Sequence, residues 1–189
     1  MTVRTTDLPD VLVLEPRVFG DARGYFLETF RAPRYQAAGI DAPFVQDNLS
    51  RSTRGVLRGL HLQNPRPQGK LVSVVEGRVW DVAVDLRVGS PHFGRWAGVE
   101  LDAESHRQFW VPPGFGHGFV VLSETAVFTY KCTDIYDQSA ELGVRWDDPD
   151  LAIDWPIEAA RIRVSDKDAE LPFLRDLPRE RLVSYEPGD

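Results

Sequence analysis

The alternating run at residues 78–86 constrains the fold of this chain most strongly. Every second residue from Trp80 to Leu86 is apolar, whereas Asp81 and Asp85 occupy the other parity. Successive side chains of a β-strand point to opposite faces, so this alternation indicates a strand whose two faces differ. We therefore predict a strand over residues 78–86.

Further apolar runs of strand length recur along the chain, bounded by Gly, Pro, Asn or Asp. We expect strands at residues 11–14, 25–30, 44–49, 56–62, 71–75, 96–101, 108–111, 118–122, 126–134 and 142–146. Residues 32–38 predict a short helix ending at Gly39, and residues 172–177 predict one helical turn. Successive strands without intervening helices exclude a doubly wound α/β fold. The fold class we predict is all-β: a double-sheet, cupin-like jelly roll with short helical segments and a C-terminal flap after Pro149.

The size and composition of the chain exclude several classes of protein. With 189 residues, one domain over residues 1–189 is expected. The net charge of −7 argues against a nucleic-acid binder with a basic surface. Cys132 is the single cysteine, which suits a reducing compartment. Residues 1–11 lack the apolar run of a signal peptide, and no run has the length of a membrane span. We expect a cytoplasmic protein with no membrane partner.

A basic block occupies residues 48–75, which contain no acidic residue. Its charges are Arg51, Arg54, Arg58, Arg66 and Lys70. One interpretation is a solvated surface that keeps the protein soluble. The other is a cleft that attracts an anionic ligand, since the fork of an arginine side chain can bind two phosphate oxygens. The charges alone do not decide between these two interpretations.

His61 lies within this block, in a stretch similar to the first metal motif of the cupin superfamily. That motif carries His-x-His, but here Gln63 stands at the second position. His117 is a further candidate ligand. A metal ion normally takes three or more protein ligands, and glutamine replaces histidine poorly. We therefore expect no metal, and His61 remains a candidate general base because imidazole titrates near neutral pH.

Strand geometry raises two questions about candidate site residues. Arg58 and His61 have opposite parity, so they share a face only if Gly59 marks a bulge. Tyr130 and Tyr136 would lie roughly 20 Å apart on a straight strand. They can contact one ligand only if the chain bends between them or the ligand is long. The alternative is that both tyrosines are core residues with a polar tip.

A specific resemblance rests on eight sequence blocks in a fixed order. They are FGDARG at 19–24, FVQDN at 44–48, VLRGLHLQ at 56–63, QGKLV at 68–72, VWDVAVD at 79–85, PGFGHGF at 113–119, YK at 130–131 and SDKD at 165–168. With these blocks the chain resembles the dTDP-4-dehydrorhamnose 3,5-epimerase family, nearly end to end. The resemblance implies a metal-free homodimer without a cofactor, with sites shared between subunits. It also implies a dTDP-4-keto-6-deoxy sugar substrate, inverted at C3 and C5.

The resemblance also implies roles for particular residues. His61 matches the base, Asp168 rather than Asp166 matches its carboxylate partner, Lys70 lies near the C4 carbonyl, and Tyr130 matches the acid. Tyr136 matches the residue that stacks on thymine. The remaining substrate-binding positions are Arg23, Glu28, Gln46, Asn48, Arg58 and His117, some of them reached across the dimer.

These roles suit proton transfer beside a ketone. Enolate formation at C4 acidifies the protons on C3 and C5, His61 would remove one, Lys70 would stabilise the developing charge, and Tyr130 would return a proton. The sequence contains no dinucleotide-binding or Walker motif. Three alternatives remain: a mono-epimerase, a metal-dependent cupin enzyme, and a non-catalytic sugar-nucleotide sensor.

Overall fold

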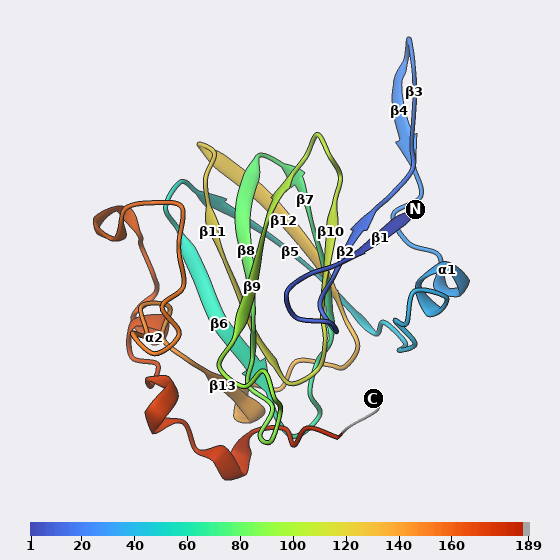
Figure 1. The fold of residues 1–189 in the computed structure, drawn as a ribbon. Helices are drawn as coiled ribbons and strands as arrows, with labels where there is room; N and C mark the ends of the chain where they lie inside the picture. Colours follow the sequence, from blue (N-terminus) through green and yellow to red (C-terminus); the bar gives the residue numbers. More distant parts are fainter. Residues whose placement is uncertain (187–189) are drawn as a thin grey trace.

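A computed structural model describes residues 1–186 and shows two packed antiparallel sheets (Figure 1). The six-stranded sheet has the order β1 (Thr2–Thr5), β2 (Leu12–Glu15), β10 (Gln108–Val111), β7 (Lys70–Glu76), β12 (Thr125–Cys132), β5 (Gln46–Thr53). The five-stranded sheet has the order β13 (Glu141–Gly143), β6 (Leu57–Gln63), β11 (Phe115–Val121), β8 (Arg78–Asp85), β9 (Trp96–Asp102). Strands β3 (Val18–Asp21) and β4 (Gly24–Leu27) form a separate hairpin. The predicted all-β jelly roll is confirmed.

Strand β8 shows why its sequence alternates. Val79 and Ala83 face the core between the two sheets. Val82 and Val84, on the other parity, pack in a second core with Leu151 of the C-terminal segment and its neighbours. Both faces of β8 are therefore buried, one by the opposite sheet and one by the C-terminal segment. The expected C-terminal flap is confirmed, and Figure 1 shows it as the orange and red chain beside β6.

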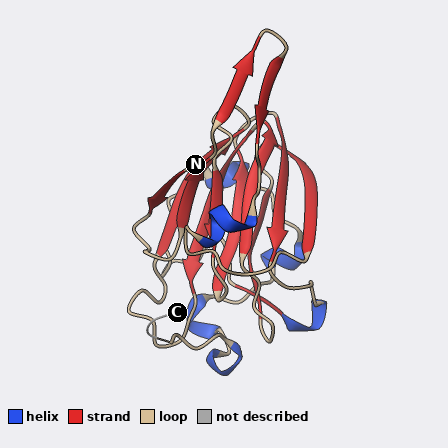
Figure 2. Cartoon of the chain, turned by 90° about the vertical axis from the view of Figure 1, so that its right-hand side faces the viewer, coloured by secondary structure: helices blue, strands red, loops and turns tan. Residues whose placement is uncertain are grey.

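Helices are short and lie outside the sheets (Figure 2). They are α1 (Ala32–Gln36), η1 (Gln138–Ala140), η2 (Ala159–Arg161), α2 (Asp166–Ala169), η3 (Leu174–Asp176) and η4 (Arg179–Arg181). The helix expected over residues 32–38 ends at Gln36, and Gly39 follows with a φ of +88°. The helical turn expected within residues 172–177 is η3.

Several strand boundaries differ from those expected. The strand expected over residues 25–30 ends at Leu27, and the strand expected over 126–134 ends at Cys132. Strand β11 begins at Phe115, three residues before the expected start, so His117 lies within it. Strands β1 and β3, whose residues are all exposed, were not predicted from the sequence. A strand held by backbone pairing at an edge buries no face, so it leaves no alternating apolar pattern.

The expectation of one domain over residues 1–189 stays a prediction, and residues 187–189 lie outside the described part of the chain. No helix within residues 1–186 has the length and apolar character needed to cross a membrane.

Candidate active site

Two adjoining cavities lie at one end of the space between the sheets. The first, about 250 Å³, is called the Tyr136 cavity and is lined by Gln46, Asn48, His61, Leu62, Gln63, Gln68, Lys70, Tyr130, Cys132, Tyr136 and Glu141. The second, about 290 Å³, is called the Asp168 cavity and is lined by Ser50, Arg58, His61, Lys70, His117, Phe119, Phe128, Tyr130, Ser165, Lys167 and Asp168. His61, Lys70 and Tyr130 line both cavities. The two cavities therefore meet at these three side chains.

A bulge in β6 brings Arg58 and His61 to the same face. His61 pairs with His117 of β11, while Arg58 pairs with Phe119, so β6 has one extra residue between the two pairs. Gly59 lies in this bulge with a φ of +119°. A Cβ atom there would lie 2.6 Å from the carbonyl oxygen of His117, so only glycine fits. The bulge considered from the sequence is confirmed.

His61 is hydrogen-bonded to a buried carboxylate. Its Nε2 lies 2.7 Å from Oδ1 of Asp168, whose residue is only 4% exposed. Oδ2 of Asp168 accepts the backbone N–H of Gly59 at 3.3 Å, and Ser165 caps helix α2 by accepting the N–H of Asp168. The neighbouring Asp166 is exposed. The cap and the bulge together set the position of the Asp168 carboxylate against the imidazole.

The charge of Asp168 sets the tautomer of His61. Burial raises the pKa of Asp168, but the hydrogen bond and charge of His61 and the N–H of Gly59 outweigh it, so the pKa is lowered. An ionised carboxylate can only accept a hydrogen bond. Nε2 of His61 therefore carries the proton, and Nδ1 carries the lone pair that a general base needs.

Lys70 and Tyr130 supply the other two groups at the junction of the cavities. Nζ of Lys70 donates to the carbonyl oxygen of His61 at 3.3 Å. Burial lowers the pKa of Lys70, opposed by the nearby Cys132, Asp81 and Glu141. Burial raises the pKa of Tyr130, so its phenol stays protonated at neutral pH. The junction thus combines an imidazole, the amino group of a lysine and a phenol.

The chain bends after β12 and brings Tyr136 to the cavity that Tyr130 also lines. The backbone N–H of Tyr136 donates to Oε1 of Gln46 at 2.9 Å, and its hydroxyl donates to Glu141 at 2.8 Å. The residue is 47% exposed, so it is not a core tyrosine. Asn48, also on β5, accepts a hydrogen bond from Gln46 at 3.0 Å. The bend considered from the sequence is confirmed.

His117 and Arg58 line the Asp168 cavity in different ways. His117 is buried, and its Nε2 lies 2.9 Å from Oδ1 of the fully buried Asp81. Arg58 is exposed and donates from Nε to Ser52 at 3.1 Å. One side therefore offers a buried imidazole and the other an exposed guanidinium.

The donor groups do not form a recognisable metal site. Nε2 of His61 and Nε2 of His117 each lie against a carboxylate, and both amide hydrogens of Gln63 are donated to backbone carbonyls. Within residues 1–186 no group of three His, Cys, Asp or Glu side chains could hold a metal ion. Activity without a metal stays a prediction.

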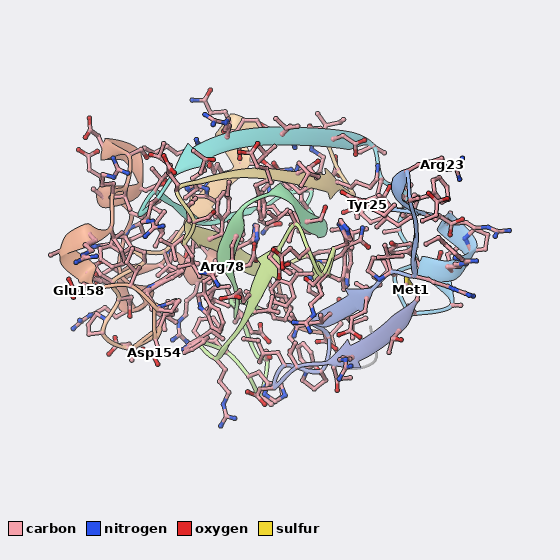
Figure 3. All side chains as sticks on the ribbon, turned by 90° about the horizontal axis from the view of Figure 1, so that it is seen from above. Met1, Arg23, Tyr25, Arg78, Asp154 and Glu158 are labelled. Atoms are coloured by element: carbon pink, nitrogen blue, oxygen red, sulfur yellow. The ribbon has the colours of Figure 1, made fainter. Side chains whose placement is uncertain are left out.

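Arg23 and Glu28 do not line either cavity of their own chain. Arg23 lies at the turn of the β3–β4 hairpin, where its side chain is 89% exposed and pairs with Asp21 (Figure 3). Glu28 pairs with Arg34 at 2.8 Å. These two residues therefore stand apart from the nine other expected site residues, catalytic and substrate-binding, which all line the two cavities.

Several residues that line the cavities were not predicted from the sequence, above all Glu141 and Lys167. Oε2 of Glu141 accepts hydrogen bonds from Tyr136 and from Nζ of Lys167. This contact joins β13 to helix α2, and no local pattern marks it. Cys132 could have been found, because it shares its parity along β12 with Tyr130.

Comparisons with known proteins agree with one another. Residues 5–176 match the family model described as dTDP-4-dehydrorhamnose 3,5-epimerase. The chain is 55% identical over 164 residues to the dTDP-4-dehydrorhamnose 3,5-epimerase of Pseudomonas aeruginosa, covering 86% of this chain and 90% of that protein. It is 49% identical over 174 residues to the enzyme of that name from Methanothermobacter thermautotrophicus, covering 92% and 94%.

A solved structure shares the fold closely. The crystal structure of dTDP-6-deoxy-D-glucose-3,5-epimerase from Legionella pneumophila, in complex with dTDP-4-keto-L-rhamnose, superposes with a TM-score of 0.95. The two chains are 50% identical, and the match covers 98% of each. The matched region includes every strand that lines the two cavities. The chain belongs to the dTDP-4-dehydrorhamnose 3,5-epimerase family.

Proposed function

We propose that this enzyme epimerises dTDP-4-dehydro-6-deoxy-D-glucose at C3 and C5, giving dTDP-4-dehydro-L-rhamnose for the biosynthesis of dTDP-L-rhamnose. One observation carries the assignment of the chemistry. His61, Lys70 and Tyr130 line both cavities, so a sugar ring at their junction would contact a base, a cation and an acid together. The reaction requires these three groups and no change of oxidation state.

His61 acts as the base in this proposal. Its Nδ1 removes a proton from C3 or C5, and Asp168 stabilises the imidazolium that forms. The electron pair of the broken C–H bond moves into the ring and leaves negative charge on O4. The Lys70 side chain, held beside the carbonyl oxygen of His61, stabilises that enolate in its protonated form, since a fixed cation acts strongly on charge that develops next to it.

Tyr130 acts as the acid and completes the inversion. The raised pKa of its phenol keeps the proton available at neutral pH. Delivery from the face opposite His61 reverses the configuration at the carbon. After this first inversion, proton exchange with solvent returns His61 to its neutral form and Tyr130 to the phenol. A second cycle at the other carbon then gives the doubly inverted product, and the same exchange restores both residues again.

The nucleotide half of the substrate occupies the Tyr136 cavity in this proposal. The exposed ring of Tyr136 stacks on thymine, and Gln46 and Asn48 offer amide groups beside it. Arg58 neutralises phosphate charge, and His117 contacts the sugar. In this proposal, part of the basic block of residues 48–75 lines a cleft that attracts the anionic substrate, and the rest is a solvated surface.

We also propose a homodimer in which the hairpin of one subunit completes the site of its partner. Large apolar residues are exposed on the hairpin, where Phe19, Tyr25 and Phe26 are 49%, 62% and 71% exposed. A monomer seldom leaves such a patch uncovered. Arg23 and Glu28 would then contact the partner's substrate. A cytoplasmic location is part of the same proposal and agrees with the single, unpaired Cys132.

Proton exchange in heavy water tests the function directly. The protein is incubated with the 4-keto sugar nucleotide in D2O, with and without a strong chelator, and the C3 and C5 protons are followed by NMR. The proposal expects deuterium at both carbons, inverted configuration and no effect of the chelator. Exchange at only one carbon would indicate a mono-epimerase, and no exchange at either carbon would indicate a sensor. If the chelator abolished exchange and one divalent ion restored it, the protein would be a metal enzyme.

A further inference from the structure

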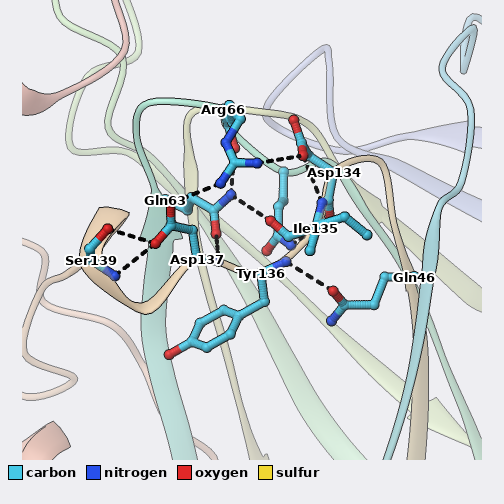
Figure 4. A network of polar contacts seen from close by, with 9 residues as sticks. Gln46, Gln63, Arg66, Asp134, Ile135, Tyr136, Asp137 and Ser139 are labelled. Atoms are coloured by element: carbon cyan, nitrogen blue, oxygen red, sulfur yellow. Dashed lines mark hydrogen bonds and ion pairs between the residues drawn. The ribbon is translucent and has the colours of Figure 1, made fainter.

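Gln63 is a buried glutamine that makes three hydrogen bonds to the backbone. It is 3% exposed and lies at the end of β6. Its Nε2 donates to the carbonyl oxygens of Arg66 at 2.7 Å and Ile135 at 3.0 Å. Its Oε1 accepts the N–H of Asp137 at 2.9 Å. Figure 4 shows this amide between β6 and the loop that carries Tyr136.

The contacts of Gln63 flank Tyr136 on both sides along the chain. The carbonyl of Ile135 and the N–H of Asp137 belong to the residues immediately before and after it. The N–H of Tyr136 itself is held by Oε1 of Gln46. Because the Tyr136 side chain is 47% exposed, packing contributes little to its orientation. The position of the ring therefore depends on the hydrogen bond from its hydroxyl to Glu141 and on how firmly these backbone groups are held.

The ion pairs of this loop lie at the surface. Arg66 pairs with Asp137 at 2.8 Å and approaches Asp134 at 3.9 Å, with its side chain 51% exposed. Ion pairs of that kind contribute little to stability. The buried amide of Gln63 is a firmer constraint, because both of its hydrogens are donated. If one of these hydrogen bonds broke, the buried polar group would have no water to replace its lost partner, and this costs free energy.

The chemistry of the amide explains why position 63 suits glutamine. The site requires two donated hydrogens and one accepted hydrogen bond from a single neutral group. A neutral imidazole has only one N–H donor, and a carboxylate has none. Leucine or methionine would fill the space and leave all three backbone groups unpaired.

We propose that Gln63 is a positioning residue for nucleotide recognition, which holds residues 135–137 so that the Tyr136 ring faces the base of the substrate. This inference rests on the proposed function of the site. Gln63 acts through Tyr136 and does not itself contact the reacting carbons. It therefore controls affinity for the nucleotide more than the rate of proton transfer.

The test compares Gln63→Met with a matched control elsewhere. Asp148→Asn is the control, because Asp148 is 2% exposed and accepts three backbone N–H groups, those of Asp150, Leu151 and Leu174, outside both cavities. We expect Gln63→Met to raise the Kd for dTDP and the KM for the sugar nucleotide about tenfold. Its kcat should stay within about twofold. The control should change thermal stability but neither Kd nor KM.

A double-mutant cycle separates positioning from general damage. Tyr136→Ala should weaken dTDP binding, and adding Gln63→Met to it should cause no further loss, because the ring being positioned is gone. Equal losses in both backgrounds would overturn the positioning role. So would a fall in kcat with unchanged Kd. If Tyr136→Ala binds dTDP as the wild type does, Tyr136 does not bind the thymine, and both that part of the proposed function and this inference are wrong. If Tyr136→Ala loses affinity for dTDP and Gln63→Met does not, the proposed thymine site is supported and only the role of Gln63 is refuted.

Hydrogen exchange gives a measurement that needs no variant. In the wild type, the amides of Tyr136 and Asp137 should exchange far more slowly than unprotected amides of an exposed loop. If these amides exchanged at the unprotected rate, the hydrogen bonds of Gln63 would not hold the loop, and the inference would be overturned. In Gln63→Met these two amides should exchange faster, while those of β8 and β11 keep their rates.

Discussion

At the scale of single residues, His61 carries the largest predicted effect. Its imidazole lies against Asp168 at the junction of the two cavities, while the groups proposed to bind thymine line the Tyr136 cavity. We expect His61→Ala to reduce kcat by about 10²–10⁴ or more and to change dTDP affinity little. Steady-state kinetics and calorimetric titration with dTDP check this. A collapse of dTDP binding would instead make His61 a nucleotide-contacting or structural residue.

Tyr130 is expected to separate exchange from inversion. In Tyr130→Phe the base can still remove a proton, but the opposite face lacks its donor, so the enolate regains a proton from His61 with retention. The loss of one hydroxyl leaves the packing nearly unchanged. In D2O, deuterium should enter C3 or C5 while the sugar keeps its configuration. If Tyr130→Phe inverted the sugar normally, another group would be the proton donor. If the variant lost exchange as well as inversion, Tyr130 would take part in forming the enolate.

Asp168 should make stability depend on acidity. Its pKa in the folded protein lies below the value of about 3.9 in the unfolded chain. The carboxylate therefore stabilises the fold fully above that value, and the contribution is lost as the pH falls through the lowered pKa. We expect the difference in unfolding free energy between wild type and Asp168→Asn to be full above the unfolded pKa and to shrink as the pH falls through the lowered pKa of Asp168. Denaturant titrations measure it, and a constant difference would contradict the assignment.

At the scale of elements, the bulge in β6 decides whether the site exists. Gly59→Ala places a Cβ atom 2.6 Å from the carbonyl oxygen of His117, at a φ of +119°. We expect a loss of about 2–4 kcal/mol in unfolding free energy and a large loss of activity, because Arg58 and His61 would lose their shared face. Urea unfolding and the epimerase assay check both effects.

Gly89 provides the control for the bulge. It has a φ of +88°, but a Cβ atom there meets no atom within 4 Å. Gly89→Ala should therefore show the cost of backbone strain alone, with activity retained. If the two variants lose equal stability and both stay active, close packing at Gly59 does not shape the site.

At the scale of the whole molecule, the hairpin predicts complementation between subunits. If Arg23 completes the partner's site, Arg23→Ala and His61→Ala each inactivate a homodimer. A heterodimer of the two variants keeps one intact site. Unfolding and refolding an equal mixture makes half of the dimers mixed, so about a quarter of wild-type activity should return. The recovered activity of the refolded mixture measures this, and the purified mixed dimer, with one intact site of two, should show about half of wild-type activity.

The recovery of activity distinguishes a hairpin that completes the partner's site from one that acts on the site of its own subunit. If Arg23 serves the site of its own subunit, every site in the mixture carries one of the two substitutions, and no activity returns. Variants that are refolded separately and then combined without exchange provide the blank.

The core strands could be predicted because burial leaves a pattern in the sequence. Strands β7 to β12 alternate or run apolar, and they were expected close to where they lie. Strands β1 and β3 were missed because all their residues are exposed, so only backbone pairing defines them. Boundaries at β4 and β12 were placed too late, since chain bends are decided by what the following residues contact.

The site could be predicted in part. His61, Lys70, Tyr130 and Asp168 were named through the resemblance, and the structure brings them together. Glu141, Lys167 and the role of Gln63 were missed. Their contacts join residues far apart along the chain, such as Glu141 with Lys167 and Gln63 with Asp137. No local periodicity records a contact of that kind.

The sequence by itself determined the strand pattern, the acidic net charge, the basic block and the family to which the chain belongs. Local side-chain periodicity and ordered motifs are properties of the chain before it folds. Only the tertiary structure decided that Gly59 forms a bulge, and that the Asp168 carboxylate meets His61 across 107 residues. It also decided that Gln63 holds the loop of Tyr136. These outcomes depend on distances between strands that packing sets, and packing acts on the whole chain at once.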